Sequence, residues 1–434
     1  MAHFAVVTPA FYSHFNAMSA LAVELIDRGH RVTFIHRPDA AMWVADARIG
    51  FYAVGADTHP PGSVHAALRR AANPGSPLGL RRVIADMADT TDMLCRTLPA
   101  AFEALGIDAV LADQMEAAAG MVAEALGIPF VSVACALPVN REPGIPLPVM
   151  PFEYGDSPRH LKMYEGSTRV YDWMMGPHRQ AVARHAHRLG LGERDNLHHF
   201  LSPLAQVSQS TSGFDFPRRE LPAHFHHVGP LRFTRRAASA KDHDYFVPEV
   251  ADDRPFIFTS LGSMQGSRFS LFRRIVRACR PLGAQLLVAH CGGLNAAQED
   301  ALRREGATWV CAFAKQDVVL ARADAVVSHA GVNTVMDAIA TRTPMLVLPI
   351  AFDHPGAAAR VLHAGIGLRA SARFSSPATI RKHVRTLLDD PSFARRMEPL
   401  AENLLHAGGT PRAADIVEAA LRLTREPDDV ACLG

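Results

Sequence analysis

Short apolar runs alternate with longer segments of helical periodicity along most of this chain. The runs Phe4–Thr8 and Arg31–Ile35 have strand length, and apolar residues between them, at positions 18, 21, 22, 25 and 26, fall on one helical face. Gly29 follows as the expected end of that helix. The runs Ala109–Ala112 and Phe130–Val133, with a helical segment at 117–126, repeat this order. Apolar strands that alternate with helices are typical of an α/β protein with a parallel sheet.

The same pattern restarts in the second half of the chain. Strands are predicted at Phe256–Ser260, Leu286–His290, Ala325–Ser328 and Met345–Leu348, whereas periodicity fades between 228 and 253. A chain of 434 residues is also too long for one ordinary core. We therefore predict two doubly wound, Rossmann-like domains at 1–228 and 254–410 that face each other across a cleft. The intervening 229–253 is the predicted linker, and 411–434 the predicted C-terminal helix and tail.

Other segments have weaker patterns. Residues 59–80, rich in Pro, Gly and Ser, are predicted to form a mobile loop, and the Pro-rich 138–151 an extended surface loop. Residues 84–105 and 170–189 have helical patterns, and 51–54 and 205–208 are short strand candidates.

Composition narrows the class of protein. With 48% hydrophobic and 20% charged residues the chain is typical of soluble globular proteins, and a net charge of +2 with scattered Arg pairs argues against nucleic-acid binding. The six cysteines form no CxxC motif, which argues against zinc and disulfides and fits a reducing cytosol. We find no signal-peptide pattern at the N-terminus and no run of about 18 apolar residues. A cytoplasmic location is expected, with at most peripheral contact at the inner face of a membrane.

Polar residues gather where the strand Ala325–Ser328 ends and a helix begins. His329 and Gly331 precede a helix whose free N–H groups form an anion site, and Asn333 and Thr334 add donors in its first turn. Asp337 lies one turn further on the same face, where a carboxylate can accept from ribose hydroxyls. An ordinary N-cap and a surface Asp are the alternative interpretation.

Two further strand exits in this half carry polar side chains. Ser263 lies in the turn after Phe256–Ser260 and could donate to a phosphate, although many strand-to-helix turns look similar. Asp353 and His354, after Met345–Leu348, could bind hydroxyl groups, or Asp353 could simply form a turn before Pro355.

In the first half, His14 and Asp113 each follow a predicted strand. A neutral imidazole can act as a general base near pH 7, and a carboxylate can fix its tautomer. The chain has 22 histidines, so a surface or capping role for His14 is the alternative.

Taken together, these residues resemble the UDP-dependent, inverting glycosyltransferases of the GT-B class over essentially the whole chain. The signature of that family is an aromatic residue with Gln three positions later, here Phe313 and Gln316, then His-x-Gly-x-Asn-Thr at 329–334. An acidic residue follows at Asp337, and an acidic-polar pair at 353–354. The sequence departs from the family in having Phe for Trp at 313, Asp for Glu at 337 and His for Gln at 354.

The resemblance implies a role for each residue. Phe313 and Gln316 would hold the uracil, Asp337 the ribose, and Asp353 with His354 the sugar hydroxyls. The diphosphate would be held by the residues near the helix start, namely Ser263, His329, Gly331, Asn333 and Thr334. His14, assisted by Asp113, would take the proton of the acceptor hydroxyl as the glycosidic bond forms, with inversion. No DxD motif suggests a metal site, so neither a metal nor another cofactor is expected.

Within the class, residues 131–152 and 202–210 are similar to the bacterial carotenoid glycosyltransferases. This similarity implies UDP-glucose as donor and an apolar hydroxylated carotenoid as acceptor, with residues 138–152 and 171–175 as candidates for an apolar lining. An apolar product also favours loose membrane contact through residues 59–80. The sequence does not determine the oligomeric state. The alternatives are a glycosyltransferase for macrolides or phenolics, a nucleotide-sugar epimerase, or a non-catalytic nucleotide-sugar binding protein.

Overall fold

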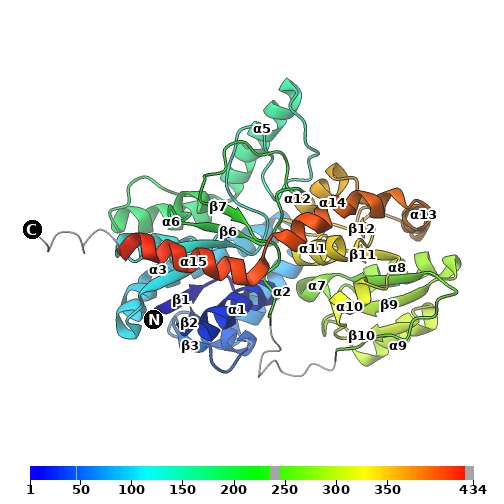
Figure 1. Cartoon of the computed structure of the whole chain (residues 1–434), viewed down its shortest axis with the longest axis horizontal. Helices are drawn as coiled ribbons and strands as arrows, with labels where there is room; N and C mark the ends of the chain where they lie inside the picture. Colours follow the sequence, from blue (N-terminus) through cyan, green and yellow to red (C-terminus); the bar gives the residue numbers. More distant parts are fainter. Residues whose placement is uncertain (45, 235–244, 426–434) are drawn as a thin grey trace, which may run out of the picture.

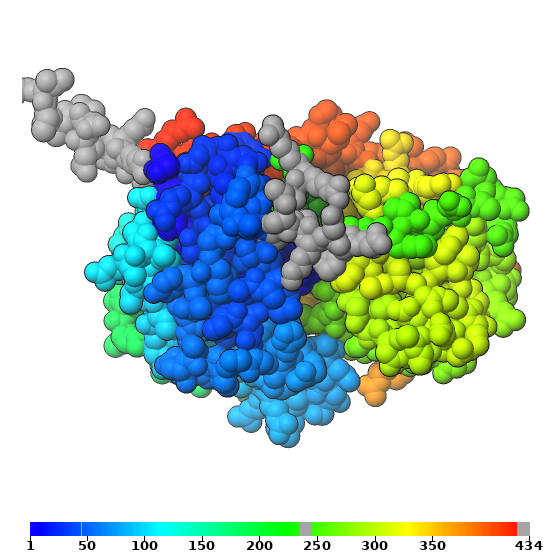
Figure 2. Space-filling model, turned by 90° about the horizontal axis from the view of Figure 1, so that it is seen from below, coloured from blue at the N-terminus to red at the C-terminus, as the bar shows by residue number. Residues whose placement is uncertain are grey.

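The computed structural model describes residues 1–44, 46–234 and 245–425, and it contains two parallel sheets (Figure 1). Figure 2 shows the N-terminal domain, in blue and cyan, beside the second domain, in green and yellow. The first has the strand order β3-β2-β1-β4-β5-β6-β7, and the second β10-β9-β8-β11-β12-β13. The predicted α/β class with two doubly wound sheets is confirmed. Part of the predicted linker, 235–244, and the tail, 426–434, lie outside the described residues.

The strands of the first sheet are β1 His3–Val7, β2 Arg31–His36, β3 Gly50–Ala53, β4 Ala109–Asp113, β5 Phe130–Ala134, β6 Gln206–Ser208 and β7 Phe225–His227. Those of the second are β8 Phe256–Ser260, β9 Gln285–Ala289, β10 Trp309–Cys311, β11 Ala325–Ser328, β12 Met345–Val347 and β13 Gly367–Arg369. The predicted strands agree with these bounds to within one residue at most ends. The short strands β7, β10 and β13 have no counterpart among the predictions.

The helices before the second sheet are α1 Tyr12–Asp27, η1 Pro38–Trp43, α2 Ser63–Ala72, α3 Pro77–Leu105, α4 Ala117–Ala125, α5 Pro158–Met174, α6 Gly176–Arg188 and η2 Leu197–Phe200. Those that follow β8 are α7 Gly262–Gln265, α8 Phe269–Cys279, η3 Arg280–Leu282, α9 Ala296–Glu305, α10 Gln316–Leu320, α11 Val332–Thr341, α12 His354–His363, α13 Pro377–Asp389, α14 Ser392–His406 and α15 Gly409–Arg425.

Each sheet has one point where its strand order reverses direction. In the first sheet the reversal lies between β1 and β4, which pair directly, for example Val7 with Ala112. In the second it lies between β8 and β11, where Ser260 pairs with Ser328. Helices leave opposite faces of the sheet at such a point and open a crevice beyond the strand ends, where ligands bind in this fold.

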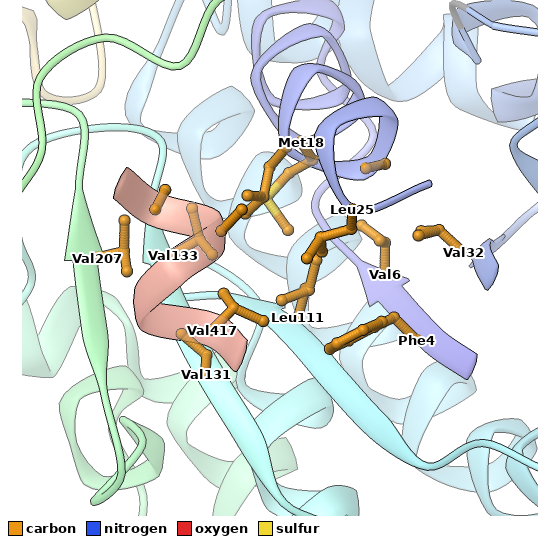
Figure 3. Close-up of a cluster of buried hydrophobic side chains, with 14 of the residues drawn as sticks. Phe4, Val6, Met18, Leu25, Val32, Leu111, Val131, Val133, Val207 and Val417 are labelled. Atoms are coloured by element: carbon orange, nitrogen blue, oxygen red, sulfur yellow. The ribbon is translucent and has the colours of Figure 1, made fainter. Parts of the chain in front are cut away.

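The last helix, α15, returns to the first sheet and closes one of its faces (Figures 1 and 3). Val417 of α15 packs in one core with Phe4, Val6 and Leu111 of the first sheet. Arg28, at the end of α1, bonds to Asp415 at 2.6 Å and to Glu418 at 2.8 Å. The end of the chain therefore ties the two domains together.

Three sequence predictions about the first half are wrong in whole or in part. Residues 59–80 contain α2 and the start of α3 rather than only a loop; Ser76 caps α3 by accepting from the amide of Gly79, and Pro77 occupies the first turn. The segment predicted as one helix at 170–189 contains the end of α5, which begins at Pro158, and all of α6, which begins at Gly176 with Pro177 in its first turn. The segment 138–151 has no helix or strand, as predicted, but it is not a surface loop, because five of its residues are buried and only Pro143 and Pro151 are exposed.

Among the described residues, no helix is both long enough and apolar enough to span a bilayer.

Candidate active site

His14 and Asp113 meet at the switch point of the first sheet. His14 lies in the first turn of α1, the helix that follows β1, and Asp113 is the last residue of β4. The Nδ1 atom of His14 lies 2.6 Å from Oδ2 of Asp113, and both side chains are buried. The fold therefore brings together the two residues that the sequence predicted as a base and its partner, although they are 99 positions apart.

Asp113 is surrounded by hydrogen-bond donors. The hydroxyl of Thr8 donates to Oδ2 at 2.8 Å, and the amide of Met115 donates to Oδ1 at 3.0 Å. Burial raises the pKa of Asp113, but the charge and hydrogen bond of His14 outweigh burial and hold it below its ordinary value. The carboxylate is therefore ionised at neutral pH and accepts a hydrogen bond from the protonated Nδ1 of His14. This tautomer leaves Nε2 of His14 as the atom that can accept a proton.

The pKa of His14 responds to two opposing effects. Burial lowers it, whereas the charge of Asp113 and the hydrogen bond to it raise it, with Asp353 adding to the rise, and the net result lies above the ordinary 6.5. Asp353 belongs to the second domain, so its effect on this pKa places the two domains close together at His14.

Cys135 completes this cluster, with ligand atoms within 4.8 Å of those of His14 and Asp113. Three such groups could in principle hold a metal ion. Burial raises the pKa of the Cys135 thiol well above 9.0, and the neighbouring Asp113 adds to the rise. A neutral thiol donates a hydrogen bond to Asp113 rather than offering the thiolate that metals prefer. The donor set fits a hydrogen-bonded dyad better than a metal site, and the predicted independence of metal stays a prediction.

His329 lies at the switch point of the second sheet, between β11 and α11. A Cβ atom on Gly262 would lie 2.7 Å from Cε1 of its ring, and one on Gly331 would lie 2.4 Å from Nε2. Gly331 was predicted to admit a phosphate; in the structure its missing side chain also makes room for the imidazole. The ring is buried, and its Nδ1 atom has no hydrogen-bond partner among the described residues. Burial, with a contribution from His354, lowers the pKa of His329 well below 6.5, so this imidazole is neutral.

Asp353 and His354 lie next to this ring. The rings of His329 and His354 are perpendicular, with centroids 4.5 Å apart. Burial, followed by the charge of Arg268, lowers the pKa of His354 to about 4. His354 was predicted on a loop, but it is the first residue of α12, with Asp353 as the N-cap. Pro355 favours this outcome, since proline is well accommodated in the first turn of a helix.

Asp337, on α11, is held by two donors. Nε2 of Gln316 donates to Oδ2 at 2.7 Å, and Nη2 of Arg232 donates to Oδ1 at 2.8 Å. Nη1 of Arg232 also donates to Oδ1 of Asn333 at 3.2 Å. A carboxylate has about four acceptor sites, so Asp337 retains the capacity to bind hydroxyl groups. Gln316, Asn333 and Asp337, predicted as parts of one site, are thus brought together.

The other predicted residues of this half are nearby in the fold. Phe313 is half-buried between β10 and α10, three positions before Gln316. Thr334 is buried in the first turn of α11, and Ser263 is exposed in α7, next to Gly262, which packs on His329.

The two switch points face each other across the domain boundary. The amide of Leu137, after β5, donates to Oδ2 of Asp353 at 3.2 Å. The rings of Phe11 and Phe352 meet at 5.7 Å. Phe352 has a left-handed φ of 54°, which is costly for an aromatic residue and is typical of functional sites. Burial raises the pKa of Asp353, and the charge of His14 counteracts this rise, so the two side chains are close enough to interact. The candidate base and the candidate sugar-binding pair therefore share one site.

Sequence reasoning missed Arg232 and Cys135. Arg232 falls within the predicted linker, where no periodicity marks it. Its backbone N–H and C=O both bond to the hydroxyl of Thr410, at 2.8 and 2.7 Å, which positions the side chain over α11. Cys135 follows β5, so its place at a strand exit was the available signal for it.

Comparisons with known proteins find relatives over nearly the whole chain. Residues 302–423 match the family model described as "Erythromycin biosynthesis protein CIII-like, C-terminal domain". The chain is 50% identical over 421 residues to the zeaxanthin glucosyltransferase of Pantoea ananas, covering 97% of this chain and 96% of that protein. It is 46% identical over 422 residues to that of Pseudescherichia vulneris, covering 97% and 98%.

Solved structures of glycosyltransferases have the same fold. The glycosyltransferase of kitacinnamycin superposes with a TM-score of 0.75 at 22% identity, covering 97% of this chain and 99% of that one. VinC, solved in complex with dTDP, superposes with a TM-score of 0.66 at 21% identity, covering 97% and 100%.

Two facing parallel-sheet domains with polar clusters at both switch points are the architecture of the GT-B class, as the sequence resemblance implied. Within that class, the chain belongs to the family of the zeaxanthin glucosyltransferases.

Proposed function

We propose that this enzyme transfers glucose from UDP-glucose to a hydroxyl group of a zeaxanthin-like carotenoid, with inversion at the anomeric carbon. The observation that carries the proposal is the buried His14–Asp113 pair, which lies beside Asp353 of the opposite domain. The two relatives named above, both zeaxanthin glucosyltransferases over nearly their whole length, support the acceptor and the sugar.

The proposed donor site uses the second switch point. The N-terminus of α11 has no side-chain cap, so its first amides can donate to a diphosphate. Asp337, held by Arg232 and Gln316, would accept from the ribose hydroxyls, and Phe313 would stack on the base. Asp353 and His354 would bind the sugar.

The proposed chemistry is a single displacement. Nε2 of His14 removes the acceptor proton as the oxygen bonds to the anomeric carbon and UDP departs, so no free alkoxide forms. The amides of α11 stabilise the charge that develops on the leaving diphosphate. The proposed path has no step that requires a metal.

The experiment that tests this proposal presents the purified enzyme with UDP-glucose and three acceptors: zeaxanthin, a macrolide and a phenol. We expect mass spectrometry to find hexosylated zeaxanthin, and UDP release only when acceptor is present. Preferential conversion of the macrolide or the phenol would overturn the carotenoid assignment. Conversion of UDP-glucose to another UDP-sugar without acceptor would indicate an epimerase.

The pH dependence of kcat/KM is expected to report the His14–Asp113 pair. Because the pKa of His14 is raised, the neutral base is lost as pH falls, and the acid limb should have its midpoint above 6.5. Asp113→Asn removes the charge that raises this pKa, so the remaining activity should have an acid limb at lower pH. An unshifted limb in this variant would contradict the assignment of His14 as the titrating base.

Arg232 is expected to support nucleotide binding by positioning Asp337. In Arg232→Ala one oxygen of Asp337 loses its donor, and we expect the Kd for UDP to rise about fivefold, equivalent to about 1 kcal/mol for a partly exposed charged hydrogen bond. Isothermal titration calorimetry measures this change. Arg322→Ala, which removes a surface Arg bonded to the carbonyl of Val250, is the control. Tighter UDP binding by Arg232→Ala would show instead that Arg232 competes for the ribose site.

A further inference from the structure

Helix α5 has an outward face that no other described element covers. Figure 1 shows α5 at the top of the view, projecting from the rest of the molecule. Of its 17 residues only Tyr164 is buried. Positions 159, 163, 166, 170 and 173 recur at spacings of four and three, so they share one face. On that face Met163, Val170 and Trp173 are 38%, 58% and 79% exposed.

Basic side chains surround these apolar ones. Arg159, Lys162 and Arg169 are all exposed on α5, against one exposed acid, Glu165, which pairs with Arg169. The other acid of the helix, Asp172, is turned inward and paired with Arg141. The outward face therefore carries a net charge of +2, from three bases and one acid.

We propose that the outward face of α5 docks on an anionic lipid bilayer. A helix face that combines exposed Trp and aliphatic side chains with Arg and Lys is typical of interfacial membrane helices. The bases would lie at the phosphate level, attracted by anionic headgroups, and Trp173 would enter the boundary with the acyl chains. Three apolar side chains on one helix face are few for a stable protein interface, which buries about 800 Å² on each partner.

The inner face of α5 connects this surface to the active site. The hydroxyl of Tyr164 donates to the carbonyl of Glu153 at 2.6 Å, and its ring stacks on Phe152. Both contacts fix α5 to the extended loop at 138–156. That loop follows Leu137, the residue whose amide bonds to Asp353. Docking through α5 would thus hold the acceptor side of the site close to the bilayer in which an apolar acceptor dissolves.

This assignment changes two sequence expectations. Trp173 was a candidate for lining an apolar site, but it is exposed and points away from the core. Membrane contact was predicted through 59–80, and Leu78 in that range is also 61% exposed. Leu78 therefore defines the rival surface in the experiment. The inference rests on the proposed function, since an apolar acceptor is the reason for membrane contact.

The test is co-sedimentation of the full chain with vesicles, without any substrate. Wild-type protein is expected to bind vesicles of phosphatidylcholine and phosphatidylglycerol and to bind pure phosphatidylcholine more weakly. Lys162→Gln should lower the partition coefficient about fivefold at low salt. Trp173→Ala should lower it for both lipid mixtures. Phe374→Ala, which removes an aromatic side chain 80% exposed on the second domain, is the matched control and should bind as wild type does.

Three results would overturn the proposal. The first is wild-type protein that stays in the supernatant with every vesicle type. The second is loss of vesicle binding in Leu78→Ser while Trp173→Ala still binds. The third is a Trp173→Ala variant that binds vesicles normally and changes only the oligomeric state measured by size-exclusion chromatography. Activity on zeaxanthin in detergent micelles, measured in parallel, tests the proposed function separately. Trp173→Ala should keep that activity and lose activity on zeaxanthin held in vesicles.

Discussion

Replacing His14 by Ala is expected to lower kcat by roughly 10²–10⁴-fold, the range for loss of a general base. The physical reason is that the acceptor hydroxyl has a pKa far above neutral and must lose its proton as the new bond forms. Without the imidazole only water can take that proton. His14 bonds to Asp113 in the first domain, whereas Asp337 and Gln316 belong to the second, so the affinity for UDP should stay at the wild-type value. Steady-state kinetics together with calorimetry of UDP binding measure both quantities.

His65→Ala is the matched control, since His65 is an exposed histidine on α2 of the same domain and should be replaceable without effect. Near-wild-type turnover in His14→Ala would refute the assignment of the base. Equal losses of turnover and of UDP affinity would indicate instead that His14 supports the fold of the cleft.

Asp215→Ala is expected to lower the free energy of unfolding by about 3–5 kcal/mol, the range for breaking a buried ion pair. Asp215 follows β6 of the first sheet and accepts from Arg360 of α12 at 2.6 Å and from Arg218 at 2.8 Å. Arg360 is fully buried, and its guanidinium also lies 4.2 Å from the Phe216 ring. Loss of the carboxylate leaves two buried cations without their counter-charge. Urea unfolding followed by two independent probes measures the change and tests two-state behaviour.

Asp300→Ala, which removes the acid of an exposed pair with Arg303, is the control and should change stability by less than about 0.5 kcal/mol. The ion pair of Asp215 with Arg360 and Arg218 also predicts that the stability of the fold depends on pH in the acid range. The two arginines outweigh burial and lower the pKa of Asp215 from 3.8 to about 2. A depressed carboxyl pKa stabilises the fold above the unfolded value, and this contribution is lost as pH falls from about 4 to about 2. Equal stability of Asp215→Ala and wild type would show that the ion pair only offsets its own desolvation.

The sequence predicted the two switch points because their signals are local. Buried parallel strands are short apolar runs, and polar residues after β1, β4, β11 and β12 stand out at the ends of those runs. Strand order is not local, so the contact of His14 with Asp113 could be proposed from the sequence only as a consequence of the fold class. The direct pairing of β1 with β4 explains that contact.

Other features depend on tertiary contacts that no local pattern marks. The sequence places Arg232 in the linker, and only the hydrogen bonds of its backbone with Thr410 bring it to α11. Arg360 and Asp215 are 145 positions apart, and either alone would be expected at the surface. Helix α5 has only one buried residue, and its exposed apolar residues lie on its outward face. Apolar periodicity in a sequence is normally interpreted as a face that packs on the core, so the sequence alone does not reveal this outward face.

The anomeric configuration of the product tests most directly the claim that His14 of one domain and the donor site of the other carry out a single displacement. Proton NMR of the glucoside formed from UDP-α-glucose and zeaxanthin measures it. We predict a β-glucoside, because attack from the His14 side inverts the anomeric carbon. An α-glucoside would contradict the account, since it requires either two displacements or attack from the face that the departing UDP occupies.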